Sequence, residues 1–278
     1  QFLWLSERDG FMHLYLYARD GTLVRQLTQG EWLIDTLPWD LLTPGRPVHI
    51  PRSGSPVHVD PSGGWAYFST TQASPLERHV TRLNLESGEM QQLTEEPGFH
   101  LASLSSDGQY LVEHFSSVDS PPVTSILRAD GSLVEVLAER GGPSLDLPQV
   151  SREFVTLKAH DGVDLSAQIV KPEGFDPARK YPVIVHGYGG PTLQLGSNRY
   201  STDNVFNHIE RDTVYTQEGF VVWRLDNRGS FGRGHDFETP IHNYLGLLAL
   251  DDQLAGVEYL QTLPYIDAER LGVDGTSF

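Results

Sequence analysis

The last eight residues, Leu271-Gly272-Val273-Asp274-Gly275-Thr276-Ser277-Phe278, form an apolar, strand-like stretch that runs into the pattern Gly-x-Ser-x. Small residues around a serine permit the strained turn between a strand and a helix on which a nucleophilic serine is exposed. The pattern therefore predicts Ser277 as a nucleophile at the end of a strand. An ordinary turn that contains a serine is the alternative, and the sequence before residue 271 decides between the two.

Strand-like stretches precede this segment. Residues 154–158 and 165–170 flank the turn Asp161-Gly162, which predicts an antiparallel hairpin. Residues 181–186 and 220–225 are nearly all apolar, as strands buried inside a parallel sheet are.

Two helices are expected between these strands. The first covers about residues 202–218, with Gly219 as its C-cap, and the second covers about residues 245–262. An apolar stripe at helical spacing in the second helix consists of Leu247, Leu250, Leu254, Val257 and Leu260. Strands that alternate with helices predict a parallel sheet with crossover helices. In such a sheet, the α/β-hydrolase fold places its nucleophile where Ser277 stands.

The first 142 residues are β-rich and contain a degenerate repeat. Short strands are joined by Asp-Gly or Ser-Gly turns, and the pair Leu-Thr recurs at residues 27–28 and 93–94. Repeats of about 40 residues with four strands are typical of β-propeller blades. A Pro- and Gly-rich insertion at residues 41–56 widens the first repeat. A β-sandwich is the alternative, but it does not explain the recurring Leu-Thr ending.

These patterns predict a partial β-propeller of C-terminal blades over residues 1–142, followed over residues 143–278 by the N-terminal half of an α/β-hydrolase domain that is truncated at the nucleophile elbow. About three blades are expected, and propellers need about four to eight to close a ring. We therefore expect either that further blades lie before Gln1 or that the domain is incomplete. Gln1 is not a methionine and begins inside a strand-like run. The compartment of the protein cannot be inferred from such a start.

Composition excludes several function classes. The formal charge of −17 disfavours nucleic acid and anionic lipid as partners, because both would be repelled. No apolar run reaches the roughly 18 residues of a membrane helix. The chain has no cysteine, and its 11 histidines show no metal-ligand spacing with carboxylates, so neither a metal nor a cofactor is expected.

Four motifs stand out: VIVHGYGGP at residues 183–191, LDNRGSFG at 225–232, DDQ at 251–253, and the final stretch at 271–278. Together they resemble the prolyl oligopeptidase family of serine peptidases, most closely its dipeptidyl peptidase IV branch. Residues 183–191 (VIVHGYGGP) resemble the oxyanion strand and loop of that family, and residues 225–232 (LDNRGSFG) resemble its Asp-x-Arg-Gly-Ser-x-Gly turn. Asp251-Asp252-Gln253, followed by residues 271–278, matches its helix-then-elbow segment. In the β-rich part, residues 93–100, 105–108 and 116–123 are similar to the last blades of its propeller. Thr276 departs from the large residue common at that position of the family.

The resemblance implies the chemistry of a serine peptidase that acts on peptides through an acyl-enzyme, and it is compatible with removal of dipeptides after proline and with a homodimer. Ser277 would attack the scissile carbonyl, activated by a histidine that an acid holds in place. The phenol of Tyr188 and the backbone N–H of Phe278 would donate to the oxyanion. For Tyr188 the alternative is a packing residue at a strand end.

The acid and the histidine follow the serine in this fold, and no residue follows Phe278. The 278-residue chain is therefore expected to be inactive by itself, and its specificity cannot be inferred. Other polar residues are interpreted as structural: an ion pair of Arg228 with Asp226 that shapes the turn, a blade-end turn at Glu95-Glu96, and a solvated or structural helix face at Asp251-Asp252. An esterase-type hydrolase and a non-catalytic propeller that binds a partner remain the rival interpretations.

Overall fold

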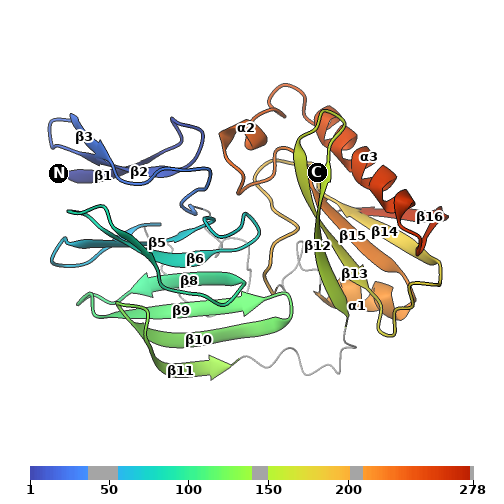
Figure 1. Ribbon diagram of the computed structural model, residues 1–278, viewed down its shortest axis with the longest axis horizontal. Helices are drawn as coiled ribbons and strands as arrows, with labels where there is room; N and C mark the ends of the chain where they lie inside the picture. The colour runs from blue at the N-terminus through green and yellow to red at the C-terminus, as the bar shows by residue number, and fades with distance from the viewer. Residues whose placement is uncertain (37–55, 140–149, 201–208, 276–278) are drawn as a thin grey trace. The chain divides into compact units, whose positions relative to one another are not determined.

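A computed structural model of the chain describes residues 1–36, 56–139, 150–200 and 209–275. The chain divides into two compact units (Figure 1). Unit 1 comprises Gln1–Pro143, Ser197–Tyr200 and Gly232–His235, and unit 2 comprises Ser144–Gly196, Ser201–Phe231 and Asp236–Phe278. The predicted insertion at 41–56 and the predicted boundary at 142–143 lie, except for Pro56, outside the described residues.

Unit 1 contains antiparallel sheets whose strands follow one another in chain order, and none of the described sheets closes on itself (Figure 1). The first sheet has β1 (Phe2–Ser6), β2 (His13–Tyr17) and β3 (Leu23–Gln26). The second has β4 (His58–Val59), β5 (Trp65–Thr70), β6 (His79–Asn84) and β7 (Met90–Gln92). The third has β8 (Phe99–Leu104), β9 (Tyr110–Ser117), β10 (Ser120–Arg128) and β11 (Leu133–Glu139).

The second sheet is buried on both faces. Alternate residues of a strand point to opposite faces, and on β5 Phe68 joins a core that contains Leu14 of the first sheet. Its neighbour Tyr67 joins a different core, which contains Leu111 and Leu127 of the third sheet. Consecutive sheets therefore pack face to face.

The recurring Leu-Thr ending has a common structural role in the first two sheets. The backbone N–H of Leu14 donates to Thr28 Oγ1 at 2.9 Å, and that of Val80 donates to Thr94 Oγ1 at 3.0 Å. Both threonines are buried. Each hydroxyl thus satisfies a buried backbone donor at the end of its sheet, which explains why the sequence repeats at this point.

Unit 2 is built on a five-stranded sheet with the order β12-β13-β15-β14-β16. The predicted hairpin is confirmed as β12 (Ser151–Lys158) and β13 (Asp164–Lys171), which pair antiparallel. The strands β14 (Tyr181–Gly187), β15 (Val221–Asp226) and β16 (Ile266–Gly275) are parallel to one another. Its helices are α1 (Ile209–Gln217) and α3 (Leu247–Thr262), and the short α2 (His235–Glu238) begins at the last residue assigned to unit 1.

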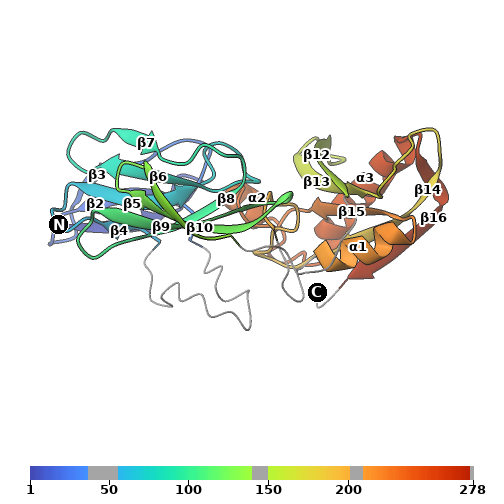
Figure 2. The ribbon, with the colours of Figure 1, turned by 90° about the horizontal axis from the view of Figure 1, so that it is seen from below.

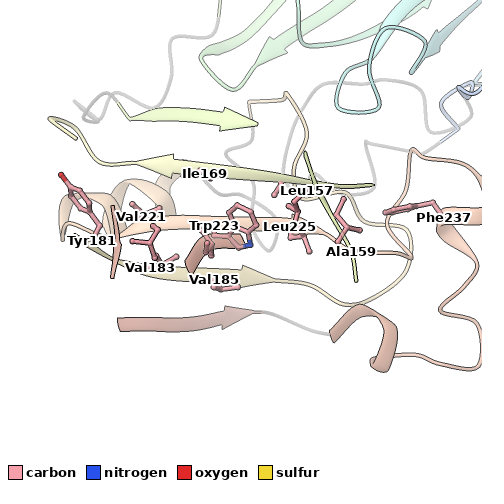
Figure 3. Close-up of a cluster of buried hydrophobic side chains, with 14 residues drawn as sticks. Leu157, Ala159, Ile169, Tyr181, Val183, Val185, Val221, Trp223, Leu225 and Phe237 are labelled. Atoms are coloured by element: carbon pink, nitrogen blue, oxygen red, sulfur yellow. The ribbon is translucent and has the colours of Figure 1, made fainter. Parts of the chain in front are cut away.

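Two neighbouring residues of β15 show that α1 and α3 cover opposite faces of this sheet (Figure 2). Trp223 stacks on Tyr259 of α3, at a centroid distance of 5.8 Å. Arg224 points to the other face, where it forms a fully buried ion pair with Asp212 of α1. The main core lies around Trp223, Val183 and Leu225 (Figure 3).

Helix α1 ends as the sequence predicts. Gly219 has φ +81°, its N–H donates to the carbonyl of Thr216, and the N–H of Phe220 donates to that of Tyr215. This pair of bonds is a Schellman motif, for which a glycine in the left-handed region is favoured. The predicted start of this helix lies outside the described residues.

The predicted apolar stripe of α3 is largely wrong. Leu247, Leu250 and Leu254 are 71%, 56% and 48% exposed, and only Leu260 of the stripe is fully buried. The face of α3 that packs on the sheet is lined by small residues instead. A Cβ on Gly256 would already be 3.3 Å from the Trp223 ring, so a larger side chain would crowd it. A large residue in the sheet thus requires small ones in the helix, and Leu247, Leu250 and Leu254 lie on the exposed face.

Candidate active site

The predicted nucleophile Ser277 and the predicted donor Phe278 lie outside the described residues. The strand that leads to them, β16, pairs in parallel with β14, and the last pair in register is Gly187 with Gly275. Tyr188 directly follows Gly187. The two chain segments predicted to carry the reaction therefore start from adjacent strand ends.

Tyr188 is half-buried, and its ring lies over Gly190. An ideal Cβ on residue 190 would be 2.8 Å from Tyr188 Oη and 2.8 Å from Cε1, so a side chain there requires the Tyr188 ring to move. The last glycine of the Gly-x-Gly-Gly run thus provides the space that the phenol occupies. The structure does not test the role of the phenol as an oxyanion donor, which stays a prediction.

The loop after Tyr188 is attached to the end of β15. Asp226, which is 2% exposed, accepts from the backbone N–H of Leu195 at 2.6 Å and from that of Gly196 at 3.2 Å. In addition, the N–H of Thr192 donates to the carbonyl of Gly229 at 3.0 Å. These bonds anchor the loop that carries Tyr188 to the turn after β15.

The predicted ion pair of Arg228 with Asp226 is wrong. Arg228 pairs with Asp252 of α3, with Nη2 2.6 Å from Oδ1, and also with Asp161 in the hairpin turn. Asp252 is fully buried and accepts the backbone N–H of Arg228 as well, at 2.8 Å. Hydrogen bonds from Arg228 to Asp252 and then to Asp161 raise the pKa of the guanidinium despite its burial. Arg228 therefore joins the turn, the helix and the hairpin.

The two aspartates of α3 differ in their surroundings. Asp251 contacts a surface histidine, with His160 Nδ1 3.0 Å from Asp251 Oδ1, and is partly exposed. Asp252 is the internal partner of Arg228. The interpretation as a solvated face fits Asp251, whereas Asp252 is structural.

A second polar cluster joins the ends of β14 and β16, and the sequence interpretation missed it. Asp274 Oδ2 lies 3.2 Å from His186 Nδ1, 3.1 Å from Arg211 Nη1 and 3.3 Å from Tyr215 Oη. Arg211 Nη1 also lies 3.1 Å from His186 Nδ1. One signal was available in the sequence: His186 and Asp274 each stand directly before a glycine at a predicted strand end.

The cluster shifts the pKa values of its members. Burial, followed by the charges of Arg224 and Arg211, lowers the pKa of His186 and outweighs its contact with Asp274. Partial burial would raise the pKa of the Asp274 carboxyl, but its contact with His186 and the charge of Arg211 lower it overall. Asp274 is therefore a carboxylate at neutral pH.

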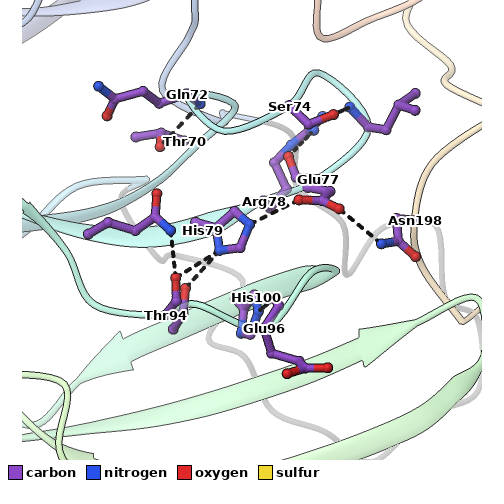
Figure 4. A network of polar contacts seen from close by, with 12 residues as sticks. Thr70, Gln72, Ser74, Glu77, Arg78, His79, Thr94, Glu96, His100 and Asn198 are labelled. Atoms are coloured by element: carbon purple, nitrogen blue, oxygen red, sulfur yellow. Dashed lines mark hydrogen bonds and ion pairs between the residues drawn. The ribbon is translucent and has the colours of Figure 1, made fainter.

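Unit 1 holds a different network (Figure 4), in which two buried histidines lie between carboxylates and carbonyls. His79 Nε2 is 3.1 Å from Glu77 Oε2, and His100 Nε2 is 2.7 Å from the carbonyl of Glu96. Asn198 donates to Glu77 Oε1 at 3.1 Å. The side chains of Glu95 and Glu96 are exposed, in agreement with their interpretation as a turn.

Within the described ranges, no group of three histidines or carboxylates could hold a metal ion. No helix among the same residues is long and apolar enough to cross a membrane.

Comparisons with known proteins find similar peptidases for both parts of the chain. Residues 1–122 match the family model described as dipeptidyl peptidase IV (DPP IV) N-terminal region, and residues 207–278 match that of the prolyl oligopeptidase family. Dipeptidyl peptidase 8 of Homo sapiens is 28% identical over 264 residues, which are 91% of this chain and 27% of that protein. Dipeptidyl peptidase 4 of Trichophyton rubrum is 27% identical over 287 residues, or 99% of this chain and 33% of that protein.

Solved structures give the same result over nearly the whole chain. The crystal structure of Porphyromonas gingivalis dipeptidyl peptidase 4 has a TM-score of 0.81 and 30% identity, and covers 99% of this chain and 36% of its own. The structure of a putative dipeptidyl aminopeptidase IV from Bacteroides ovatus has a TM-score of 0.79 and 29% identity. The match covers 99% of this chain and 38% of that one. The chain spans about a third of the length of these relatives.

The antiparallel sheets of unit 1 and the parallel strands of unit 2 thus define the class of the chain, a protein with the fold of the dipeptidyl peptidase 4 structures. Both family models and the relatives identify it further. In sequence and in fold, the chain is similar to the prolyl oligopeptidase family and to its dipeptidyl peptidase IV branch.

Proposed function

We propose that this chain is part of a dipeptidyl peptidase IV-like serine peptidase that hydrolyses peptides through an acyl-enzyme. The observation that supports it most directly is the register of β14 and β16. Because Gly187 pairs with Gly275, the segments that lead to Tyr188 and to Ser277 start side by side. A nucleophile and an oxyanion donor must lie on either side of one carbonyl group, and adjacent strand ends suit that requirement.

In this mechanism Ser277 Oγ attacks the scissile carbonyl while a histidine accepts the hydroxyl proton. The tetrahedral oxyanion receives hydrogen bonds from Tyr188 Oη and from the backbone N–H of Phe278. The proton then passes to the leaving amine, and water hydrolyses the acyl-enzyme in the second half of the reaction. The histidine and its acid belong to the part of the protein that follows the serine in this fold.

We also propose that the sheets of unit 1 are blades of a β-propeller and that residues 143–278 are the N-terminal half of an α/β-hydrolase domain, with residues 1–142 as the propeller part. Meandering antiparallel sheets that pack face to face support the propeller. Apolar residues are exposed on the sheets at both ends of the row, with Trp4 56% and Leu133 62% exposed. Further blades in the whole protein would cover such residues.

The test is peptide hydrolysis by the natural full-length protein, with products identified by mass spectrometry and Ser277→Ala as control. We expect the wild-type protein to cut short peptides and the Ser277→Ala variant not to cut them. The product masses show whether dipeptides are released and after which residue. If the protein hydrolyses small acyl esters but not peptides, the esterase alternative is supported. Binding of peptides without hydrolysis would support the non-catalytic alternative.

Two further expectations accompany the proposal. The 278 residues alone are expected to be inactive in the same assay. The full-length protein is expected to form a homodimer, which light scattering checks.

A further inference from the structure

The cluster of His186, Arg211, Tyr215 and Asp274 lies where the two proposed catalytic segments begin. Asp274 stands directly before Gly275 on β16, and His186 stands directly before Gly187 on β14, opposite Asp274 in register. Arg211 and Tyr215, one helical turn apart on α1, supply the other contacts of the Asp274 carboxylate. Three elements of unit 2 thus meet at one carboxylate oxygen.

We propose that His186, Arg211 and Asp274 are positioning residues, which fix the ends of β14 and β16 relative to each other and thereby set the distance between Tyr188 and Ser277. This inference rests on the proposed function. The three residues act through Tyr188 and Ser277 and do not touch the substrate.

The geometry supports a defined protonation state of the cluster. Arg211 Nη1 is 3.1 Å from both His186 Nδ1 and Asp274 Oδ2, so one nitrogen can donate its two hydrogens to the two partners. That arrangement requires an unprotonated Nδ1, and therefore a neutral imidazole. Asp274 Oδ2 then accepts from Arg211 and Tyr215.

Protonation of His186 would change this pattern, because Nδ1 would then donate to Asp274 and could no longer accept from Arg211. Among the described residues, the charged and titratable groups around His186 include Arg211 and Tyr215 from α1, Asp274 from β16, and Arg224 from β15 with its partner Asp212. The side chain of His186 is only 3% exposed, and its burial together with Arg224 and Arg211 lowers its pKa. The neutral arrangement is therefore the one present at neutral pH.

A purely structural cluster would stabilise the sheet without affecting the reaction, so the test must separate the two roles. The measurement is the rate constant of serine labelling by a saturating fluorophosphonate probe in the natural full-length protein, in conditions where urea titration shows each variant to be folded. Asp274→Asn and Arg211→Gln are the test variants. Asp267→Asn and Arg270→Gln are the matched controls, because Asp267 and Arg270 form an exposed ion pair on the same strand.

We expect both test variants to lower the rate constant about tenfold, since a small displacement of catalytic groups is costly, and both controls to stay within about twofold of the wild type. We also expect His186→Gln to remove one ionisation from the pH profile of labelling below pH 6.5, the ordinary pKa of the side chain. Arg211→Gln keeps the test decisive if Asp274→Asn does not fold.

Two results would overturn the inference, and they are distinguishable. Labelling of the test variants at the wild-type rate, with an unchanged pH profile, contradicts the positioning role alone. Absence of labelling in the wild-type protein contradicts the proposed function, and the positioning role with it.

Discussion

The phenol of Tyr188 occupies the space next to Gly190 that any larger residue would need, with Oη only 2.8 Å from the position of a Cβ at residue 190. Gly190→Ala should therefore displace the Tyr188 ring. If Tyr188 donates to the oxyanion, the variant of the full-length protein should lose at least about tenfold in kcat, because removal of an oxyanion donor costs about 100- to 1,000-fold.

The control for this variant is Gly64→Ala, in which the nearest heavy atom to the new Cβ is Ser62 Oγ at 3.4 Å. That distance is an ordinary contact, so kcat should not change. A Gly190→Ala variant with wild-type kcat would show that the position of Tyr188 does not matter for the reaction.

The buried ion pair of Arg228 and Asp252 predicts a large loss of stability when one partner is removed. Asp252→Asn would leave the guanidinium of Arg228 buried with Asp161 as its only remaining carboxylate in the cluster. We expect the free energy of unfolding to fall by about 3–5 kcal/mol, measured by urea titration. Asp251→Asn, which removes a partly exposed carboxylate beside it, should cost less than about 1 kcal/mol. Equal effects of the two variants would contradict the assigned roles.

The repeated threonine contact predicts that two distant substitutions have similar effects. Thr28→Val and Thr94→Val each remove the acceptor of a buried backbone N–H, that of Leu14 or that of Val80. Each should lower the free energy of unfolding by about 1–3 kcal/mol in a urea titration. Thr262→Val, on the exposed surface of α3, is the control and should have little effect. A large effect at only one of the two repeat positions would show that they are not equivalent.

Two histidines predict opposite pH dependences of stability. Burial lowers the pKa of His114 below 6.5, although Glu113 opposes the shift. The unfolded chain then binds more protons, so the contribution of His114 is lost as the pH falls below about 6.5. Hydrogen bonds to Asp251 and Glu258 raise the pKa of His160. Its contribution is therefore complete below about pH 6.5 and is lost as the pH rises through the raised pKa.

Urea midpoints at pH 5.5 and 7.5 test these signs. The His114→Gln variant should lose less stability on acidification than the wild type. The His160→Gln variant should lose more, by a small amount because the side chain is 43% exposed. The same slope in both variants would contradict the assigned environments.

Local patterns in the sequence were sufficient to predict the central strands and the end of α1. Buried parallel strands are continuously apolar, so residues 181–186 and 220–225 identify β14 and β15 to within one residue at each end. The C-cap at Gly219 follows from local backbone geometry alone.

The errors come from contacts between residues far apart in the sequence. The buried face of α3 is set by Trp223 on β15, so small residues rather than leucines face the sheet. Arg228 was assigned to a neighbour two residues away, whereas its partner Asp252 lies 24 residues further along the chain. The pairing of His186 with Asp274 likewise depends on a strand register that no local pattern contains.

The most direct test of the central claim is to label the natural full-length protein with a fluorophosphonate and to map the adduct by mass spectrometry. The proposal predicts one adduct, on Ser277, which is lost in the Ser277→Ala variant together with peptide hydrolysis. An unlabelled Ser277 in the folded protein, or peptide hydrolysis that persists in Ser277→Ala, would contradict it.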